Sequence, residues 1–352
     1  MNTRQAITVE LMELLQSQPV TKRALQSSIT NANFSDIESL EHYFDFLDMV
    51  VTLIPSARNL NPVVSKFYFL VDKSLDDTLR VDEGFQEWVR KFARDWGKFL
   101  DTKESAANLH SFYSDPSYHM SDYIPGPSGW LSFNQFFARQ IKPGKRPIEG
   151  LCDHESIVSP ADSVFQGAWP IEEKSTIIIK DLSLSISQLL AGSSFQDRFR
   201  GGLFTHSFLD VNDYHRFHLP IGGVVKEIRK IPGHAMMDVI RQADGSLGIV
   251  DGVGYQFTQD RGLIVIETGI GMVAVLPIGM AQVSSVNLTP DLGECLIKGE
   301  EFGYFSFGGS DIITLFEADR VELTATIGRH YKQGQQIGHV KKTYRDDLIE
   351  LA

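Results

Sequence analysis

Residues 302–316, FGYFSFGGSDIITLF, contain the pattern that decides how the C-terminal half of the chain folds. The runs Phe302–Phe307 and Ile312–Phe316 are short, apolar and rich in aromatic or β-branched residues, which is typical of strands. Gly308-Gly309-Ser310-Asp311 separates them, and a Gly-Gly pair is ordinary chemistry for a tight hairpin turn. The stretch therefore predicts two strands and a turn, and leaves open whether the turn also takes part in chemistry.

Short apolar runs separated by Gly, Pro, Asn and Asp continue through the whole chain from residue 150 onward. The runs are Ile157–Val158, Thr176–Ile179, Gly223–Ile228, Leu263–Glu267, Met272–Pro277 and Gln282–Val286. Strands at this spacing favour a mostly antiparallel sheet that closes on itself or packs on another. We therefore expect a β barrel or sandwich-like domain over residues 151–352.

The first 115 residues have a different, helical pattern. Apolar residues three and four apart run through Phe85, Trp88, Val89, Phe92, Trp96, Phe99 and Leu100. This spacing predicts one buried face of a helix over 85–100 that ends near Asp101, and a weaker pattern predicts a second helix over 39–54. Residues 116–150 are interpreted as a linker with a short helix that wraps the core. The expected fold class is α+β, with a helical N-terminal extension.

Composition narrows the classes of function. The net charge of −12 argues against a nucleic-acid partner. The N-terminus lacks the apolar core of a secretory signal, and the two cysteines, Cys152 and Cys295, allow a single disulfide that the sequence cannot confirm. We expect a cytoplasmic protein, with a homodimer left open.

Two further stretches have residue types that suit catalysis. Asp162 ends Ser-Pro-Ala-Asp, which alone would be read as a turn. His215 and His218 lie in DYHRFHLP, and no partner motif accompanies them that would indicate a metal site. With Ser310, these stretches supply an Asp, a His and a Ser, the three residue types of a nucleophile, its base and the group that orients the base.

The joint pattern resembles the phosphatidylserine decarboxylase family of pyruvoyl-dependent enzymes. The stretches that support the resemblance are FNQFFARQIKPGKRPI (133–148), SPAD (159–162), DYHRFHLP (213–220), IGMAQVSSV (278–286) and FGGS (307–310). They follow the family's order and cover roughly residues 129–330. WGKFLDTKESAANLH (96–110) and the helices before it resemble the extension of a soluble branch that includes fungal tryptophan decarboxylase.

The resemblance implies that the chain cuts its own Gly309–Ser310 bond. Ser310 would attack the carbonyl carbon of Gly309, and Gly308 and Gly309 would permit the sharp bend that this attack needs. His218 matches the family's base, and Asp162 would orient its ring. The products would be a β chain of 1–309 and an α chain of 310–352 that stay together as partners.

The resemblance also implies the cofactor, a pyruvoyl group made from Ser310, with no metal and no pyridoxal phosphate. This ketone would form a Schiff base with an α-amino acid, which then loses CO2. His215 is expected to deliver a proton or to hold the substrate carboxylate. A free aromatic L-amino acid such as tryptophan is the expected substrate, because no basic amphipathic helix suited to a membrane is evident in residues 1–60.

Three alternatives stay open at this point. Phosphatidylserine is the other substrate, and it would bring the protein into peripheral contact with a membrane. Asp311 stands where the family usually has Thr or Ser, and Ser163 where it mostly has Gly, so an uncleaved homologue that acts as a binding protein is a further alternative. A conventional serine hydrolase is the third, although the Ser310 context is not G-x-S-x-G.

Overall fold

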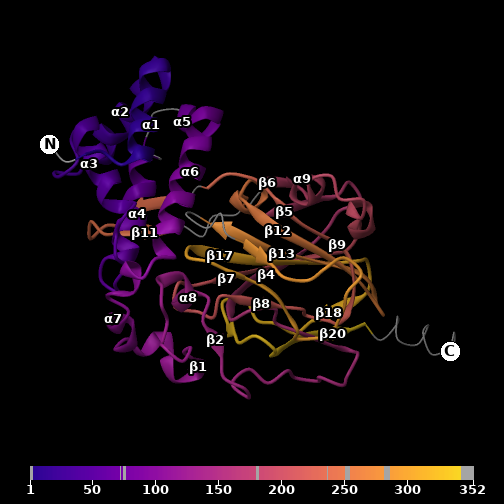
Figure 1. Ribbon diagram of the computed structural model, residues 1–352. Coiled ribbons are helices and arrows are strands. Elements are labelled where there is room, and N and C mark those ends of the chain that lie inside the picture. The colour runs from indigo at the N-terminus through magenta and orange to yellow at the C-terminus, as the bar shows by residue number, and fades with distance from the viewer. Residues whose placement is uncertain are drawn as a thin grey trace. The chain divides into compact units, whose positions relative to one another are not determined.

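The computed structural model describes residues 3–341, apart from 72, 74–76, 180–181, 236, 250–253 and 281–285 (Figure 1). The chain forms two compact units. The helical unit comprises Met1–Tyr118, Gly126–Phe136 and His234–Gly252, and the β-rich unit comprises His119–Pro125, Phe137–Gly233 and Val253–Ala352. The helical unit thus includes Gly126–Phe136 and His234–Gly252, which the sequence patterns assigned to the linker and to the β-rich domain.

The helical unit contains most of the helices. They are α1 (Ala6–Ser17), α2 (Pro19–Ala32), α3 (Leu40–Val50), α4 (Leu60–Val71), α5 (Thr78–Val81), α6 (Glu83–Leu100) and α7 (His110–Tyr113), with 3-10 turns at Glu104–Ala106 and Pro116–Tyr118. Helix α6 confirms the predicted helix over 85–100, and α3 confirms the weaker one over a shorter span. The Asp82 carboxylate caps α6 by accepting from the Phe85 N–H at 2.7 Å, and the helix ends before Asp101.

A β hairpin also belongs to the helical unit. Strands β10 (Val239–Arg241) and β11 (Leu247–Ile249) pair antiparallel and pack against α4. The Arg241 guanidinium donates to the Ala32 carbonyl of α2 at 2.7 Å. A segment far along the chain thereby completes the helical unit.

The β-rich unit contains the remaining strands. They are β1 (Tyr123–Ile124), β2 (Gln140–Ile141), β3 (Ser156–Val158), β4 (Ser163–Pro170), β5 (Thr176–Ile179), β6 (Leu182–Ser185), β7 (Leu203–Leu209), β8 (Arg216–His218), β9 (Gly223–Ile231), β12 (Arg261–Thr268), β13 (Gly271–Met280), β14 (Val286–Leu288), β15 (Cys295–Leu296), β16 (Glu301–Phe305), β17 (Gly309–Phe316), β18 (Val321–Leu323), β19 (His330–Tyr331) and β20 (Gln336–Val340). Short helices lie between them: η3 (Met120–Asp122), α9 (Ile186–Leu190), η4 (Gln196–Phe199) and η5 (Tyr255–Phe257). Helix α8 (Phe133–Phe137) crosses the boundary of the two units, within the predicted short helix.

Eight antiparallel strands form the main sheet, in the order β15-β9-β12-β13-β17-β7-β4-β19. The central strands lie side by side in Figure 1. Within the described residues β15 and β19 are the two edges, so the sheet is open and the barrel alternative is not what forms. The predicted runs fall on β3, β5, β9, β12 and β13, whereas 282–285 lie outside the described residues.

The two strands predicted over 302–316 are confirmed as β16 and β17, but the prediction that they pair with each other as a hairpin is wrong. Strand β16 pairs with β14 and β8 in a separate three-stranded sheet, whereas β17 pairs with β13 and β7. The chain therefore changes sheets at Phe307-Gly308, where Gly308 has φ 149°. The physical reason lies in the aromatic side chains, because Phe302 and Phe305 pack on Phe217 of β8 at 4.7 and 4.9 Å between ring centroids.

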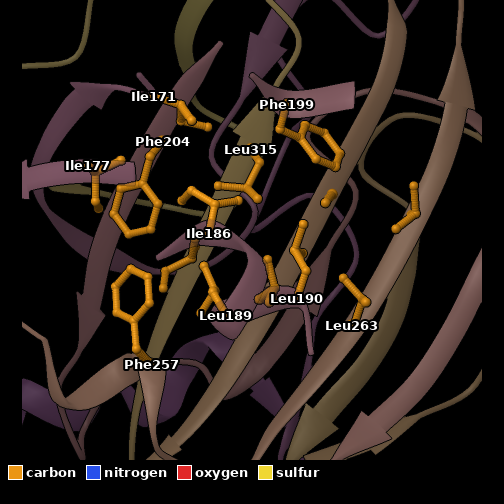
Figure 2. Packing of buried hydrophobic residues seen from close by; sticks show 14 of the residues in the cluster. Ile171, Ile177, Ile186, Leu189, Leu190, Phe199, Phe204, Phe257, Leu263 and Leu315 are labelled. Carbon is orange, nitrogen blue, oxygen red and sulfur yellow. The ribbon is translucent and has the colours of Figure 1, made fainter. Parts of the chain in front are cut away.

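One face of the main sheet packs against α9 and η5. Figure 2 shows Leu189 and Leu190 of α9 among the apolar side chains of the sheet, including Leu315 of β17. The ring of Phe257 in η5 stacks on that of Phe204 in β7, with centroids 6.0 Å apart. This buried cluster holds β17 in the middle of the sheet.

Two observations complete the fold. Cys152 and Cys295 are exposed free thiols, so the disulfide that the sequence allows does not form. In the parts of the chain that the structure describes, no helix combines the length and the apolar character needed to cross a membrane.

Candidate active site

Ser310 is the second residue of β17, a strand with partners on both sides. It pairs with Gly279 of β13 and Leu209 of β7, and its side chain is fully buried. Its Oγ atom has no hydrogen-bond partner among the described residues. Because a buried hydroxyl without a partner is costly, this one is a candidate for a reactive group.

Asp311 follows Ser310 but faces the other side of the sheet. Successive side chains of a strand point to opposite faces, and Asp311 shares its face with Ile313 and Leu315. The Tyr255 hydroxyl donates to Asp311 Oδ2, and His206 Nε2 lies 3.1 Å from Oδ1. The carboxylate is therefore bound on the face opposite to Ser310, although it is next to the expected cleavage site in the chain.

His218 ends β8 and is held at both ring nitrogens. Nδ1 lies 2.9 Å from the Gly299 carbonyl, and Nε2 lies 3.2 Å from the Tyr214 hydroxyl. A carbonyl oxygen only accepts, so Nδ1 carries the proton and Nε2 is the basic atom, which accepts from Tyr214. Burial lowers the pKa of His218 to about 4, so the ring is neutral at pH 7.

His215 precedes β8 and has the same tautomer. Its Nδ1 donates to the Asp213 carbonyl at 3.0 Å, whereas Nε2 has no partner within the described part of the chain. Burial, with a smaller contribution from the Arg139 charge, lowers the pKa of His215 to about 3. Its ring lies 3.9 Å from that of Phe137, which in turn contacts Phe307 at 5.4 Å between centroids. These rings link His215 to the residue before Gly308.

The Asp162 carboxylate is held by Arg146 and not by His218. Arg146 Nε lies 2.8 and 3.0 Å from its two oxygens, and the backbone N–H of Gln333 donates to Oδ1 at 2.8 Å. In the described structure neither ring nitrogen of His218 bonds this carboxylate. The expectation that Asp162 orients the ring directly is therefore not what this structure shows, although the carboxylate does raise the pKa of His218 against the stronger effect of burial.

The fold brings the sequence motifs together in part. Segment SPAD meets the histidine segment through the backbone, because His218 N–H donates to the Pro160 carbonyl at 2.8 Å. Ser310 Oγ bonds neither histidine among the described residues. Across those residues, no group of three or more His, Cys, Asp or Glu side chains is placed to hold a metal ion.

Sequence reasoning missed several residues of this site. Arg146 lies in a run of basic residues, where nothing in the sequence separates it from Lys142 or Lys145. Tyr214 is adjacent to His215 in DYHRFHLP, and that adjacency was the available indication. His330 lies more than a hundred residues away, yet its Nε2 is 2.9 Å from the Asp213 carboxylate, and this bond raises the pKa of His330.

A cavity of about 580 Å³ has a lining that does not include Ser310. Its lining includes Ile221, Ile270, Leu296 and Lys298. Ile270 precedes the start of β13, whereas Gly279, the partner of Ser310, is near the end of that strand. At about 3.3 Å per residue, the two ends of β13 are separated by roughly 25–30 Å, so the Ile270 end of this cavity is far from Ser310. Lys298, on another part of the lining, directly precedes Gly299, whose carbonyl holds His218.

The chain matches the family model described as phosphatidylserine decarboxylase over residues 133–339. This span contains Asp162, His215, His218 and the Gly308–Ser310 segment. The matched region therefore includes every residue that the sequence motifs single out for chemistry.

Curated relatives have the same family name. The chain is 30% identical over 251 residues to phosphatidylserine decarboxylase proenzyme 2 of Oryza sativa subsp. japonica, covering 70% of this chain and 39% of the rice protein. It is 33% identical to phosphatidylserine decarboxylase proenzyme 3 of Schizosaccharomyces pombe, covering 71% of this chain and 26% of that protein. It is 31% identical to the phosphatidylserine decarboxylase proenzyme of Fusobacterium nucleatum, covering 68% of this chain and 77% of that protein.

Proposed function

Because the chain belongs to the phosphatidylserine decarboxylase family of pyruvoyl-dependent carboxy-lyases, we propose that it processes itself at Gly309–Ser310 and then decarboxylates phosphatidylserine. The observation that supports this proposal is the buried Ser310 hydroxyl, which has no hydrogen-bond partner among the described residues and lies directly after two glycines. The three relatives described above are all named as proenzymes, which supports processing.

Self-cleavage begins with attack by Ser310 Oγ on the Gly309 carbonyl carbon. An Oγ–C bond forms, the Gly309–Ser310 amide bond breaks, and an ester joins the two residues. Loss of the Ser310 Cα proton then breaks the Cβ–Oγ bond and releases the Gly309 carboxylate. Water hydrolyses the resulting dehydroalanine, ammonia leaves, and residue 310 retains a ketone. Gly308, at φ 149°, has a backbone conformation that favours glycine, and it directly precedes strand β17, which begins with Gly309.

His218 is our candidate for the base of this reaction. Its ring is neutral at pH 7, because burial lowers its pKa to about 4, so Nε2 can accept a proton. That atom already accepts from the Tyr214 hydroxyl at 3.2 Å. Burial raises the pKa of Tyr214, so its hydroxyl stays protonated and keeps donating to this nitrogen. Asp162 and Arg146 act from a distance by fixing the segment whose carbonyl holds His218.

The residues around Ser310 fit a pyruvoyl group, because Ser310 is buried at the start of a paired strand that anchors the chain on which the group would form. That group supplies an electron sink when a carboxylate leaves the substrate. His215 has its basic Nε2 without a partner among the described residues. In this form it cannot donate to a substrate carboxylate. We assign it instead to take a proton from the substrate ammonium group and to return one to the product.

The relatives reverse the order in which the sequence ranks the two substrates. The sequence favours a free aromatic amino acid, whereas the three relatives described above are named for phosphatidylserine. Both substrates present the same α-amino acid group, so the residues at Ser310 cannot select between them. A lipid substrate would also require contact of the protein with a bilayer. The cytoplasmic location and the homodimer stay predictions.

Processing is tested by the mass of the purified protein. We expect two chains, of residues 1–309 and 310–352, and a single intact chain from the Ser310→Ala variant. An intact wild-type chain that persists for days would contradict self-cleavage and favour the alternative of an uncleaved binding protein.

The substrate is tested by CO2 release from the cleaved protein. The arms are phosphatidylserine in detergent micelles, L-tryptophan, and other free amino acids, each with Ser310→Ala protein as the control. Release from phosphatidylserine alone supports the proposal. Release from tryptophan alone would restore the order that the sequence favours.

A further inference from the structure

A polar cluster lies on the face of β17 that does not carry Ser310. Asp311 is fully buried, and its carboxylate contacts the Tyr255 hydroxyl and His206 Nε2. Gln256 Nε2 lies 3.4 Å from the same His206 nitrogen. We call Asp311, Tyr255, His206 and Gln256 the Asp311 cluster. The proposed cleavage and decarboxylation give this cluster no role.

The cluster connects three elements of the β-rich unit. Asp311 belongs to β17, His206 to the neighbouring strand β7, and Tyr255 to the short helix η5. His206 pairs with Ile313, two residues after Asp311, so both side chains face η5 and the cluster shown in Figure 2. A carboxylate buried in apolar surroundings is stable only when polar groups compensate its lost hydration. The hydrogen bond from Tyr255 therefore holds Asp311 Oδ2 on this side of the sheet. Oδ1 lies 3.1 Å from His206 Nε2 but has no hydrogen-bond partner among the described residues.

Cleavage would change what holds the start of β17. Before cleavage, Ser310 is joined to Gly309 and through it to the rest of the chain. Afterwards residue 310 is the end of a 43-residue chain, and Asp311 is the first residue that keeps an ordinary side chain. Chain ends fray unless they are tied down. Backbone bonds to β13 and β7 remain, and the Asp311 side chain adds a contact to η5.

We propose that the Asp311 cluster is an anchor that positions the new chain end, and with it the pyruvoyl group, after self-cleavage. This inference rests on the proposed function. Asp311, Tyr255 and His206 are positioning residues, since they act on the reacting group through the strand. The anchor matters little while the Gly309–Ser310 bond is intact, because that bond then holds the same end.

The test compares one change in two backgrounds. Tyr255→Phe removes the hydroxyl that Asp311 accepts from, and it is made in the wild-type chain and in the uncleavable Ser310→Ala chain. Amide hydrogen exchange is measured over 311–316. We expect exchange to rise about tenfold in the cleaved protein, the effect of one lost hydrogen bond to a charged group, and less than twofold in the uncleaved protein. In the cleaved protein kcat should fall while KM for phosphatidylserine changes little.

Matched variants separate anchoring from general stability. Tyr331 is another buried tyrosine of the same unit, on the edge strand β19, and its hydroxyl accepts from the Thr326 N–H at 2.9 Å. Tyr331→Phe should leave exchange over 311–316 equal in the two backgrounds. Asp311→Asn keeps the size of the side chain and removes its charge. If Tyr255→Phe does not fold, this variant allows the same exchange measurement. We expect Asp311→Asn to cleave and to show the same dependence on background.

Three outcomes would overturn the anchor. Equal increases in both backgrounds would make the cluster an ordinary part of the core. Unchanged exchange in cleaved Tyr255→Phe and Asp311→Asn would show that these contacts hold nothing. Loss of cleavage in both variants would place the cluster before the cut instead of after it. Failure of the proposed function itself is seen separately, as an intact wild-type chain before any variant is made.

Discussion

Ser310 and Asp311 are neighbours in the chain, yet their side chains lie in opposite environments. Both are fully buried on β17. The Ser310 hydroxyl has no hydrogen-bond partner among the described residues, whereas the Asp311 carboxylate accepts from Tyr255 through Oδ2, and only its Oδ1, near His206, is without a hydrogen bond there. The pleat of a strand sends the two side chains to opposite faces of the sheet. One strand can therefore present a reactive group on one face while the other face holds the strand in place.

The largest expected effect is the difference in self-cleavage between a substitution at Ser310 and a substitution at Asp311. Ser310→Ala should abolish cleavage, because it removes the only atom of that residue able to attack Gly309. Asp311→Asn should still yield both chains, since the altered carboxylate faces away from the scissile bond. Intact mass after expression measures both. Loss of cleavage in Asp311→Asn would show that the faces of β17 are not independent.

The next effect concerns a buried carboxylate held by a cation. Arg146→Met removes the charge opposite Asp162, and both side chains are almost fully buried. An unpaired buried carboxylate should cost about 3–5 kcal/mol of unfolding free energy, measured by urea titration. The matched control is Lys145→Met, whose ion pair with Asp122 is exposed on the lysine side and should be worth less than about 1 kcal/mol. Similar losses in both variants would contradict this contrast.

An effect that is smaller per pH unit concerns the two buried histidines. Burial lowers the pKa of His218 to about 4 and that of His215 to about 3, so the unfolded chain binds more protons below pH 6.5. Stability should therefore fall as pH falls from about 6.5 towards 4, by up to about 1.4 kcal/mol per pH unit for each ring. Urea titrations from pH 7 to 4 measure the slope. His215→Gln should reduce it, and an unchanged slope would count against a neutral buried His215.

The smallest effect is expected at His330, which is partly exposed. Its bond to Asp213 raises its pKa, so the stability it contributes is present at low pH and is lost as pH rises through its pKa in the folded protein. His330→Gln should cost less than about 1 kcal/mol at pH 6, and still less at pH 8.5, because solvent screens the pair. The two urea titrations check the sign. A larger loss at the higher pH would contradict it.

Local patterns in the sequence predicted local structure well. The apolar spacing over 85–100 corresponds to α6, and the run Thr176–Ile179 is strand β5. Both predictions depend on contacts within one element or on one face, and periodicity reports these directly. The hairpin over 302–316 failed because strand pairing depends on which distant strands offer the better partner, here β8 for β16 and β13 for β17.

The candidate site divides in the same way. Ser310, His215, His218 and Asp162 were found from short motifs whose residue types suit the chemistry. The hydrogen-bond partners of these residues were not predicted, because Arg146 and Gly299 come from other parts of the chain. The expected pairing of Asp162 with His218 was reasonable for the residue types. In this structure the Arg146 guanidinium binds the Asp162 carboxylate instead.

Four things follow from the sequence alone: the helical extension, the β-rich remainder, the resemblance to the family and the residues able to react. These are set by residue type and by spacing along the chain, and both can be read without knowing what lies nearby. Only the tertiary structure decided that the Gly-Gly segment joins two sheets, that both histidines have their basic atom at Nε2, and that Asp311 faces away from Ser310. The reason is that strand pairing and burial depend on contacts between segments far apart in the sequence, such as Gly299 with His218, 81 residues apart, and Tyr255 with Asp311, 56 residues apart.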